Sequence, residues 1–449
     1  MFTYLKLKNF MSFKDITINL ESKKNEPKKV VIIYGQNGSG KSTITKAFSV
    51  LKRTIQTMQV RDMLSDILDD KFIPPEDIPL KPEIVLDMLK SRLSNNTIEK
   101  VISNYKMIGS KESMSLEYGF NINGNIGSYY IEMDDDSIIE ERLEYKLNKK
   151  KSCYFEINKN LKMINQKIFK SEEMLNDIKQ QVKMYWGKHS FLSIILYEVT
   201  EKSESYVRSN IIENLLEVIN QFGKINYKIR KAHNDENSSI DTDDYLLENL
   251  EYGVIDINQK EELAVVEKVL NNFLKSLFDD VKKAFYKTNV EKEKITYSLW
   301  LTKKIENLEY DIDFEKESTG TQEILELLPY LMLAASGKCV IIDEYGIGIH
   351  DLLAAQLIKS VSQHLKGQLI ITTHNTLIMD QSDIPAESLY FIMDDKKLNK
   401  SVKCVTDLEE RLHPNYNYRK RYFTKDIYGE ALPKINIDID LEEFSKLYS

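Results

Sequence analysis

Cysteine is rare in this sequence. Among its 449 residues are only three cysteines, Cys153, Cys339 and Cys404, which are far apart and lack CxxC spacing. An odd and scattered set of thiols argues against a disulfide framework and indicates no zinc site. We therefore expect a protein of the reducing cytoplasm.

Long apolar runs are also missing. No stretch approaches eighteen uncharged apolar residues, so we expect a soluble chain with no membrane span. The opening MFTYLKLKNF alternates apolar and polar side chains, unlike a signal peptide. Positive charge is not in excess, since the net charge is -8. That charge argues against a surface devoted to nucleic acid, although a local basic face stays compatible with it.

Glycine and proline are scarce, with 16 and 9 residues, whereas 42% of the chain is hydrophobic and 29% is charged. This composition is typical of a folded, helix-rich protein and not of a disordered one. A chain of this length usually exceeds one ordinary core, so we expect two closely packed lobes.

The N-terminal region predicts a strand, a loop and a helix in succession. Residues 2–20 alternate as a hairpin does, and Val30–Tyr34 is a continuous apolar run typical of a strand buried on both faces. From Ile44 to Met58 apolar residues recur at spacings of three and four, which places them on one helix face. The glycine-rich loop between them has the context that a phosphate-binding loop requires.

That loop predicts ATP binding. Its candidate residues are Gly35, Gln36, Asn37, Gly38, Ser39, Gly40, Lys41, Ser42 and Thr43. The glycines let backbone N–H groups converge on phosphates at a helix N-terminus. Lys41 would reach the β and γ phosphates, and Ser42 would offer a hydroxyl to Mg²⁺. A mere turn is the alternative, which the full motif between strand and helix argues against.

An acidic pair, Asp343-Glu344, ends the apolar strand predicted at 339–342. Ligands bind at the carboxyl ends of strands in parallel sheets. We expect Asp343 to orient Mg²⁺ and Glu344 to polarise the attacking water. Taken alone, such a pair is equally compatible with a helix cap, but the phosphate loop favours catalysis.

Two further segments carry candidate site residues. His374 follows the strand predicted at 368–372, beside the acidic strand, where it would donate toward the γ-phosphate instead of serving as an ordinary surface histidine. Ser318 and Gly320 precede an apolar helix whose first N–H groups suit an anion. Ser318 is equally compatible with a plain N-cap.

The middle of the chain is less informative. Pro74-Pro75 interrupts a helical stretch, Met114–Asp134 alternates as strands do, and 156–290 is mostly helical, with apolar stripes over 161–182 and 263–281. We expect the N-terminal ATPase core in 1–60, a β-rich part in 61–150, a helical insertion in 151–300 and the C-terminal core in 301–449.

Taken together, the motifs resemble the ABC-type ATPases that include RecF, the SMC proteins and the OLD nucleases. LKLKNFMSFKDITINL resembles the family's first strands, GQNGSGKST its phosphate loop and ESTGTQ its signature. VIIDEYGIGIHD, IITTH and NYRKRYFTKDIYGEALP resemble bacterial ATPases of phage-defence and abortive-infection systems (RloA, AbiL and the ATPases of PARIS and Septu). The implied fold is α/β, a P-loop head with an N-terminal antiparallel hairpin, a parallel core sheet and a largely helical inserted lobe.

The resemblance also implies how two copies pair. Two heads would join head to tail, so that Ser318 and Gly320 contact the γ-phosphate bound by the other copy, and His350 would face the dimer. Asp351 after Gly348-Ile349-His350 departs from the family's usual ending. Gln56 and Gln59 are the candidates for the family's Q-loop glutamine.

OLD nucleases continue into a metal-binding Toprim domain, for which the segment after His374 is too short. Asp394-Asp395 and Asp438-Ile439-Asp440 are therefore interpreted as surface acids. The resemblance then implies a separate effector, often a nuclease or toxin, encoded nearby.

The leading hypothesis is a cytoplasmic defence ATPase, a homodimer or higher even-numbered oligomer whose ATP state controls that effector after a nucleic-acid or phage-derived trigger. A DNA-repair ATPase is the alternative, because Arg419, Lys420 and Arg421 stand among three tyrosines, Tyr416, Tyr418 and Tyr422. A transporter subunit shares the chemistry, but the long insertion before the signature argues against it.

Overall fold

The computed structural model describes most of the chain. The described residues are 1–69, 71–72, 82–148, 150–230, 237–242, 244–380, 383–394, 399–408, 417–424 and 431–432. Several residues discussed above lie outside them, namely Pro74, Pro75, Asp395, Tyr416, Asp438 and Asp440. Within the described residues, no helix is both long enough and apolar enough to cross a bilayer.

The first two strands of the chain belong to a seven-stranded antiparallel sheet. Its strand order is β10-β9-β8-β7-β6-β1-β2. The strands are β1 (Phe2–Phe10), β2 (Phe13–Asn19), β6 (Met114–Ile122), β7 (Asn125–Met133), β8 (Ile138–Leu147), β9 (Lys150–Asn158) and β10 (Lys162–Ile164). The predicted N-terminal hairpin and the strands expected over 114–134 are present. Because β8 and β9 pair with each other, the sheet includes residues on both sides of the boundary expected at residue 150.

A second seven-stranded sheet forms the core, with the order β12-β11-β17-β18-β5-β19-β20. Its strands are β5 (Val30–Tyr34), β11 (Asn226–Ile229), β12 (Asn237–Ser239), β17 (Cys339–Ile342), β18 (Gln368–Thr372), β19 (Leu389–Asp394) and β20 (Lys400–Cys404). The five central strands are parallel, and the two edge strands are antiparallel. The predicted α/β fold with a parallel core sheet is confirmed. The short hairpin of β3 (Glu21–Lys23) and β4 (Glu26–Pro27) precedes β5.

Helices cover both faces of the core sheet. On one face, α1 (Lys41–Leu68) packs against the core sheet, and α2 (Pro82–Ser94) contacts α1. The apolar cluster on this side extends to the antiparallel sheet and to α3 (Ile98–Tyr105), α4 (Glu172–Tyr185), α5 (Phe191–Glu201), α6 (Glu204–Asn210) and α7 (Glu213–Gly223). The other face packs with α10 (Thr319–Ser336), α11 (Asp351–Ser362), α12 (Val405–Leu408) and α13 (Tyr418–Phe423). Helix α1 runs without a break across the boundary expected at residue 60.

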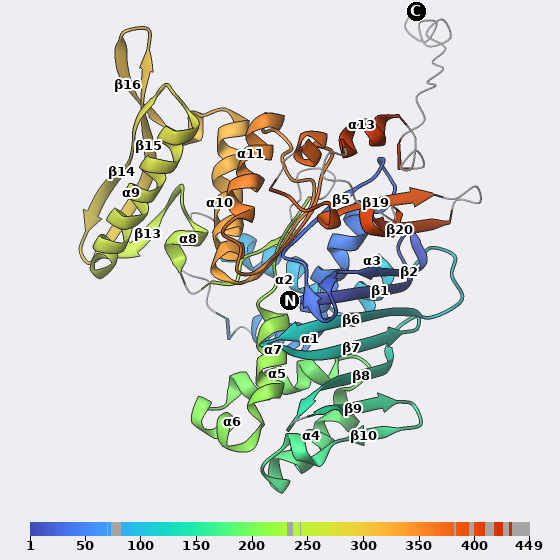
Figure 1. The fold of residues 1–449 in the computed structure, drawn as a ribbon. Coiled ribbons are helices and arrows are strands. Elements are labelled where there is room, and N and C mark those ends of the chain that lie inside the picture. Colours follow the sequence, from blue (N-terminus) through green and yellow to red (C-terminus); the bar gives the residue numbers. More distant parts are fainter. Residues whose placement is uncertain are drawn as a thin grey trace, which may run out of the picture.

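A smaller unit lies at one end of the molecule (Figure 1). It contains α8 (Tyr245–Glu248), β13 (Tyr252–Asp256), α9 (Lys260–Leu277), β14 (Val281–Glu291), β15 (Lys294–Ile305) and β16 (Leu308–Asp313). Its own apolar core includes Leu325 and Leu328 of α10, so the unit is packed against that helix. The inserted region therefore holds strands as well as helices.

The two helices expected from apolar stripes differ in outcome. The stripe over 263–281 corresponds to α9, except that Val281 already belongs to β14. The helix expected over 161–182 is wrong in its first half, where the chain forms β10 and a 3₁₀ turn at Gln166–Ile168 before α4 begins at Glu172. Alternate residues of a short strand can fall at helical spacings, so the stripe alone did not separate the two.

A buried carboxylate joins the antiparallel sheet to α5. Glu141 of β8 accepts hydrogen bonds from the Tyr129 hydroxyl at 2.9 Å, the Trp186 Nε1–H at 3.0 Å and the backbone N–H groups of Phe191 at 2.6 Å and Leu192 at 3.4 Å. Burial raises the pKa of Glu141 to about 7, although these four donors favour the charged form. The carboxylate thus acts as a buried cap for the first turn of α5.

Replacing Glu141 with glutamine is expected to destabilise the fold by roughly 2–4 kcal/mol, because an amide NH₂ would meet groups that donate. Since the pKa of Glu141 in the folded chain lies above its usual value of 4.5, the wild type should lose stability as pH rises from about 4.5 to about 7. Urea unfolding across this pH range measures both effects. Glu156→Gln on β9 is the control, and equal pH slopes for wild type and Glu141→Gln would refute the assignment.

Candidate nucleotide site

The core sheet brings the predicted site residues to one edge. Strands β17, β18 and β5 are parallel neighbours, with Ile342 paired to Ile371 and Thr372 paired to Ile33. Their carboxyl ends therefore meet at the same edge of the sheet, which is where ligands bind in such folds. The loop after β5, the acids after β17 and the histidine after β18 all emerge there.

The loop from Gly35 to Gly40 joins β5 to α1 and is closely packed. Gly40 has φ of 117°, and a Cβ at this position would lie 2.7 Å from Phe13 Cζ and 2.8 Å from Ser12 Oγ. Both the backbone conformation and the space require glycine at Gly40. The turn between β1 and β2 thus presses against the start of α1.

Lys41 is buried in this loop. Its Nζ donates to the carbonyl oxygens of Gly35 at 2.8 Å and Gln36 at 3.1 Å. Burial lowers the pKa of Lys41, while Asp343 and Glu344 oppose that change by attraction. The ammonium therefore lies within electrostatic reach of both acids.

Asp343 offers a free oxygen. Its Oδ1 accepts a hydrogen bond of 2.6 Å from the Thr372 hydroxyl, and its backbone N–H donates to the Lys228 carbonyl at 2.8 Å. Its Oδ2 is buried and has no hydrogen-bond partner among the residues that the structure describes. A buried carboxylate oxygen without a partner calls for a ligand, and an octahedral Mg²⁺ that keeps several waters suits it.

Glu344 is held in an unusual conformation. Its φ of 55° is left-handed, which costs energy for a residue with a side chain and occurs often at functional sites. Its backbone N–H donates to Thr372 Oγ1 at 2.8 Å. Together with Lys41 and Ser42, Glu344 lines a pocket of about 550 Å³. Thr372, which orders both acids, was not predicted as a site residue.

The other wall of this pocket comes from two connected segments. Met11 and Ser12 belong to the β1–β2 turn, and Asn104 and Lys106 come from the end of α3 and the residue after it. The Met11 N–H donates to the Tyr105 carbonyl at 2.7 Å, which joins the two segments. The pocket thus extends beyond the phosphate loop, with room for more than phosphates.

His374 lies just past β18 and is exposed. Partial burial of the ring lowers its pKa, Lys41 lowers it further, and Asp343 opposes both. These surroundings therefore favour the neutral imidazole over the charged form. His374 lines a second pocket, of about 310 Å³, with Tyr34, Gly35 and Tyr422.

The signature segment does not join this site within the chain. Ser318 Oγ accepts from the Thr321 N–H at 3.2 Å, so the N-cap alternative describes its contact here. A Cβ on Gly320 would lie 2.6 Å from the Gly348 carbonyl, so the segment is packed against the loop that follows Glu344. Ser318 is exposed, and residues 318–320 are not among those that line the phosphate-loop pocket.

A protein-family model identifies the chain. The family described as "AAA domain, putative AbiEii toxin, Type IV TA system" matches residues 30–380. This span is more than half of the 449 residues and includes the phosphate loop, the acidic pair and His374. The chain belongs to this AAA-domain family.

Solved structures resemble this AAA-domain protein only distantly. The SMC head domain from Thermotoga maritima is 15% identical with a TM-score of 0.36, over 90% of this chain and 98% of that one. The Smc head domain with an extended coiled coil bound to the C-terminal domain of ScpA, derived from Pyrococcus furiosus, is 13% identical with the same TM-score, over 90% and 96%. A comparison with curated proteins finds no match.

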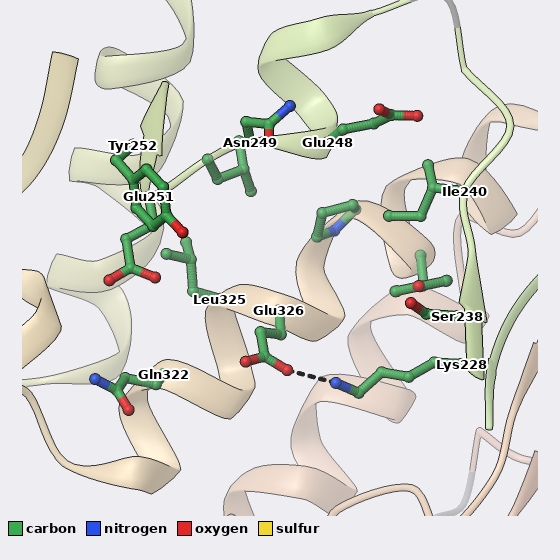
Figure 2. A pocket seen from close by; sticks show the side chains of 13 residues that line it. Lys228, Ser238, Ile240, Glu248, Asn249, Glu251, Tyr252, Gln322, Leu325 and Glu326 are labelled. Carbon is green, nitrogen blue, oxygen red and sulfur yellow. Dashed lines mark hydrogen bonds and ion pairs between the residues drawn. The ribbon is translucent and has the colours of Figure 1, made fainter. Parts of the chain in front are cut away.

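Behind the signature, Lys228 connects the core sheet of this AAA-domain protein to α10. Figure 2 shows the Lys228 side chain meeting Glu326, and the two end groups are 2.5 Å apart. Both residues line a pocket of about 280 Å³. Lys228 also lies 3.7 Å from Glu323, which pairs with Arg230 at 3.1 Å. The strand that bonds Asp343 through its backbone thus holds the signature helix through its side chains.

Three sequence-based interpretations need correction or qualification. Gln56 and Gln59 lie on α1, about 22 Å or more along the helix from Lys41, so neither reaches the phosphates. Asp394 is not a plain surface acid, because it accepts a hydrogen bond of 2.8 Å from Gln36 Nε2 in the phosphate loop. His350 caps α11 by accepting from the Leu352 N–H.

The basic and aromatic cluster near the C-terminus is largely engaged within the chain. Tyr422 is buried and stacks on Phe391 with ring centroids 5.5 Å apart. Arg419 pairs with Asp380 at 3.1 Å. These contacts agree with a packed tail and leave less of the cluster available to nucleic acid.

Proposed function

We propose that this protein is an ABC-type ATPase that binds Mg²⁺-ATP at the phosphate loop and hydrolyses it. The observation that carries the proposal is the free, buried Oδ2 of Asp343 at the sheet edge where Lys41 and Glu344 line one pocket. Enzymes that transfer a phosphoryl group to water use these groups, namely a cation, a carboxylate that binds the metal and a second carboxylate.

Each residue has a distinct role in this proposal. Backbone N–H groups from Gly38 to Thr43 cradle the phosphates at the N-terminus of α1, and Lys41 neutralises their charge. The Ser42 hydroxyl and Asp343 hold Mg²⁺. When bound, Mg²⁺ neutralises charge on the β and γ phosphates.

Glu344 is the proposed general base that orients and polarises the attacking water, since its side chain shares the pocket with Lys41. The imidazole N–H of His374 would donate to the γ-phosphate. The Thr372 hydroxyl positions both acids, because it donates to the Asp343 carboxylate and accepts from the Glu344 backbone N–H.

We further propose that two copies share each site, with Ser318 and Gly320 of one copy completing the nucleotide site of the other. The position of Ser318 supports this proposal. Ser318 is exposed at the N-terminus of α10, and it does not line the phosphate-loop pocket of the same chain. A helix N-terminus with free N–H groups suits a phosphate offered from outside.

Mixing two inactive variants tests this sharing. Ser318→Arg and Glu344→Gln are each expected to lack ATPase activity alone. In a mixed pair, one site combines the intact Glu344 of one chain with the intact Ser318 of the other. An equal mixture should therefore regain at most about a quarter of wild-type activity, which is the value for chains that pair at random, where half of the pairs are mixed and each has one intact site. Glu344→Gln homodimers that stay paired around ATP lower this fraction, so the two variants are mixed before ATP is added.

The exposed Ser209 on α6 supplies a control for the bulk and charge of the new arginine, since Ser209→Arg assayed alone should keep full activity. A mixture of Ser318→Arg and Glu344→Gln that stays inactive, with both variants folded, would contradict the shared site.

At the level of the cell, we propose a defence role in which the ATP state controls a separate toxic effector encoded nearby. The family description names a toxin of a type IV toxin–antitoxin system, which supports a function in a paired toxic system. The DNA-repair alternative has weaker support because Tyr422 and Arg419 are engaged internally. A duplex affinity that falls steeply with salt would favour that alternative.

A further inference from the structure

The hairpin of β19 and β20 flanks the phosphate loop on the side away from β18. Asp394 at the end of β19 and Lys400 at the start of β20 are cross-strand partners. Asp394 Oδ2 accepts the Gln36 Nε2–H at 2.8 Å, and Lys400 Nζ donates to the Gly38 carbonyl at 2.7 Å. One side chain therefore holds the loop near its start and the other holds its tip.

The first part of the loop rests directly on β19. A Cβ on Gly35 would lie 3.1 Å from Ile392 Cβ and 2.5 Å from Ser39 Oγ, so the loop has little room at this end. The tip of the loop has more space around it, because a Cβ on Gly38, whose φ is 76°, would meet nothing within 4 Å. Without a partner, the exposed tip at Asn37 and Gly38 would have much conformational freedom.

The two side chains are themselves partly withdrawn from water. Burial lowers the pKa of Lys400, and Asp394 opposes the change by attraction. Asp394 Oδ1 is buried without a hydrogen-bond partner in the part of the chain that the structure describes. Groups in such surroundings form stronger hydrogen bonds than the same groups in water.

We propose that Asp394 and Lys400 are positioning residues that hold the phosphate loop in its nucleotide-binding conformation. This inference rests on the proposed ATP site. It assigns to Gln36, a loop residue whose side-chain amide donates to Asp394, the role of an anchor. It also gives β20, the antiparallel edge strand, a function in nucleotide affinity.

The expected consequence is a change in binding and not in turnover. A loop that is already ordered avoids part of the entropy cost of closing around phosphates. Once nucleotide is bound, the phosphates themselves order the loop. Removing the anchors should therefore raise the KM for ATP and the Kd for ADP while kcat stays near the wild-type value.

A double-mutant cycle on Gln36 and Asp394 tests the contact itself. Gln36→Ala and Asp394→Ala should each weaken Mg²⁺-ADP binding by about tenfold, a typical loss for one such hydrogen bond to a charged group. The double variant should be no weaker than either single variant, because both changes remove the same bond. Additive losses, or an unchanged Kd, would overturn the proposal for Asp394.

Lys400 is tested with a matched pair of lysines on β20. Lys400→Met should raise KM by about tenfold, Lys400→Arg should restore it because arginine still donates, and Lys403→Met at the exposed neighbour should have no effect. A fall in kcat with constant KM would overturn the assignment, as would an equal effect of Lys403→Met.

Two measurements separate this proposal from others. Thermal unfolding of the nucleotide-free variants should match the wild type within a few degrees, and a large loss would instead assign Asp394 and Lys400 a general structural role. Lys41→Ala is measured in parallel. If that variant binds ADP normally, the proposed ATP site fails, whereas loss of binding there with no effect at Asp394 and Lys400 overturns only the anchoring.

Discussion

Replacing Lys41 with alanine is expected to abolish nucleotide binding, with a loss of at least about 100-fold, or roughly 3 kcal/mol. The Lys41 ammonium is the buried cation of the loop and lies within electrostatic reach of Asp343 and Glu344. Without it, the phosphates would lack the buried cation that offsets the negative charge of Asp343 and Glu344. Charge-assisted hydrogen bonds to phosphate would be lost at the same time.

Titration calorimetry with Mg²⁺-ATP and Mg²⁺-ADP measures this effect. Lys46→Ala is the matched control, since Lys46 lies on the same helix α1 but outside the loop, and it should bind as the wild type does. Lys41→Ala must also be shown to be folded, because its Nζ bonds two loop carbonyls. Binding within threefold of the wild type would remove Lys41 from the site.

Replacing Glu344 with glutamine is expected to leave nucleotide binding intact and to lower kcat by roughly 10³-fold, within the range for loss of a general base. Glutamine keeps the shape of the side chain, and the backbone N–H that bonds Thr372 is unaffected. What disappears is the carboxylate that polarises water. The strained φ of Glu344 remains, so the loop geometry should persist.

Single-turnover hydrolysis and size-exclusion chromatography with ATP test this variant. If heads pair around ATP, Glu344→Gln should accumulate the paired form that the wild type passes through quickly. Glu309→Gln on the exposed strand β16 controls for removal of an acid elsewhere. Hydrolysis by Glu344→Gln at the wild-type rate would show that another group activates the water.

Local patterns were enough to predict the framework of the candidate site. The strand Val30–Tyr34, the glycine-rich loop and the helix from Lys41 are adjacent in sequence, so a hydrophobic pattern and a motif define them together. The same holds for the acids after β17 and for His374 after β18. Each depends on a strand and the residues that follow directly.

Longer-range relations escaped prediction. Strand β11 is only Asn226–Ile229, in a region with a helical pattern, yet it pairs in parallel with β17 more than a hundred residues later. Such pairing depends on backbone groups that are distant in the sequence, and a strand of four residues is too short to show a recognisable hydrophobic pattern. The interpretation of Asp394 as a surface acid was wrong for the same reason, since its partner Gln36 belongs to the other end of the chain.

Glycine conformations, helix N-termini and strand ends are properties of short segments, so the sequence alone was enough to predict the candidate phosphate loop and the acidic pair. The orientation of those residues depends on contacts that form only in the folded chain. Thr372 orders Asp343 and Glu344, Lys228 holds the signature helix, and the β19–β20 hairpin holds the phosphate loop. These contacts join segments far apart in the chain, so they exist only after the core sheet has brought its strands together.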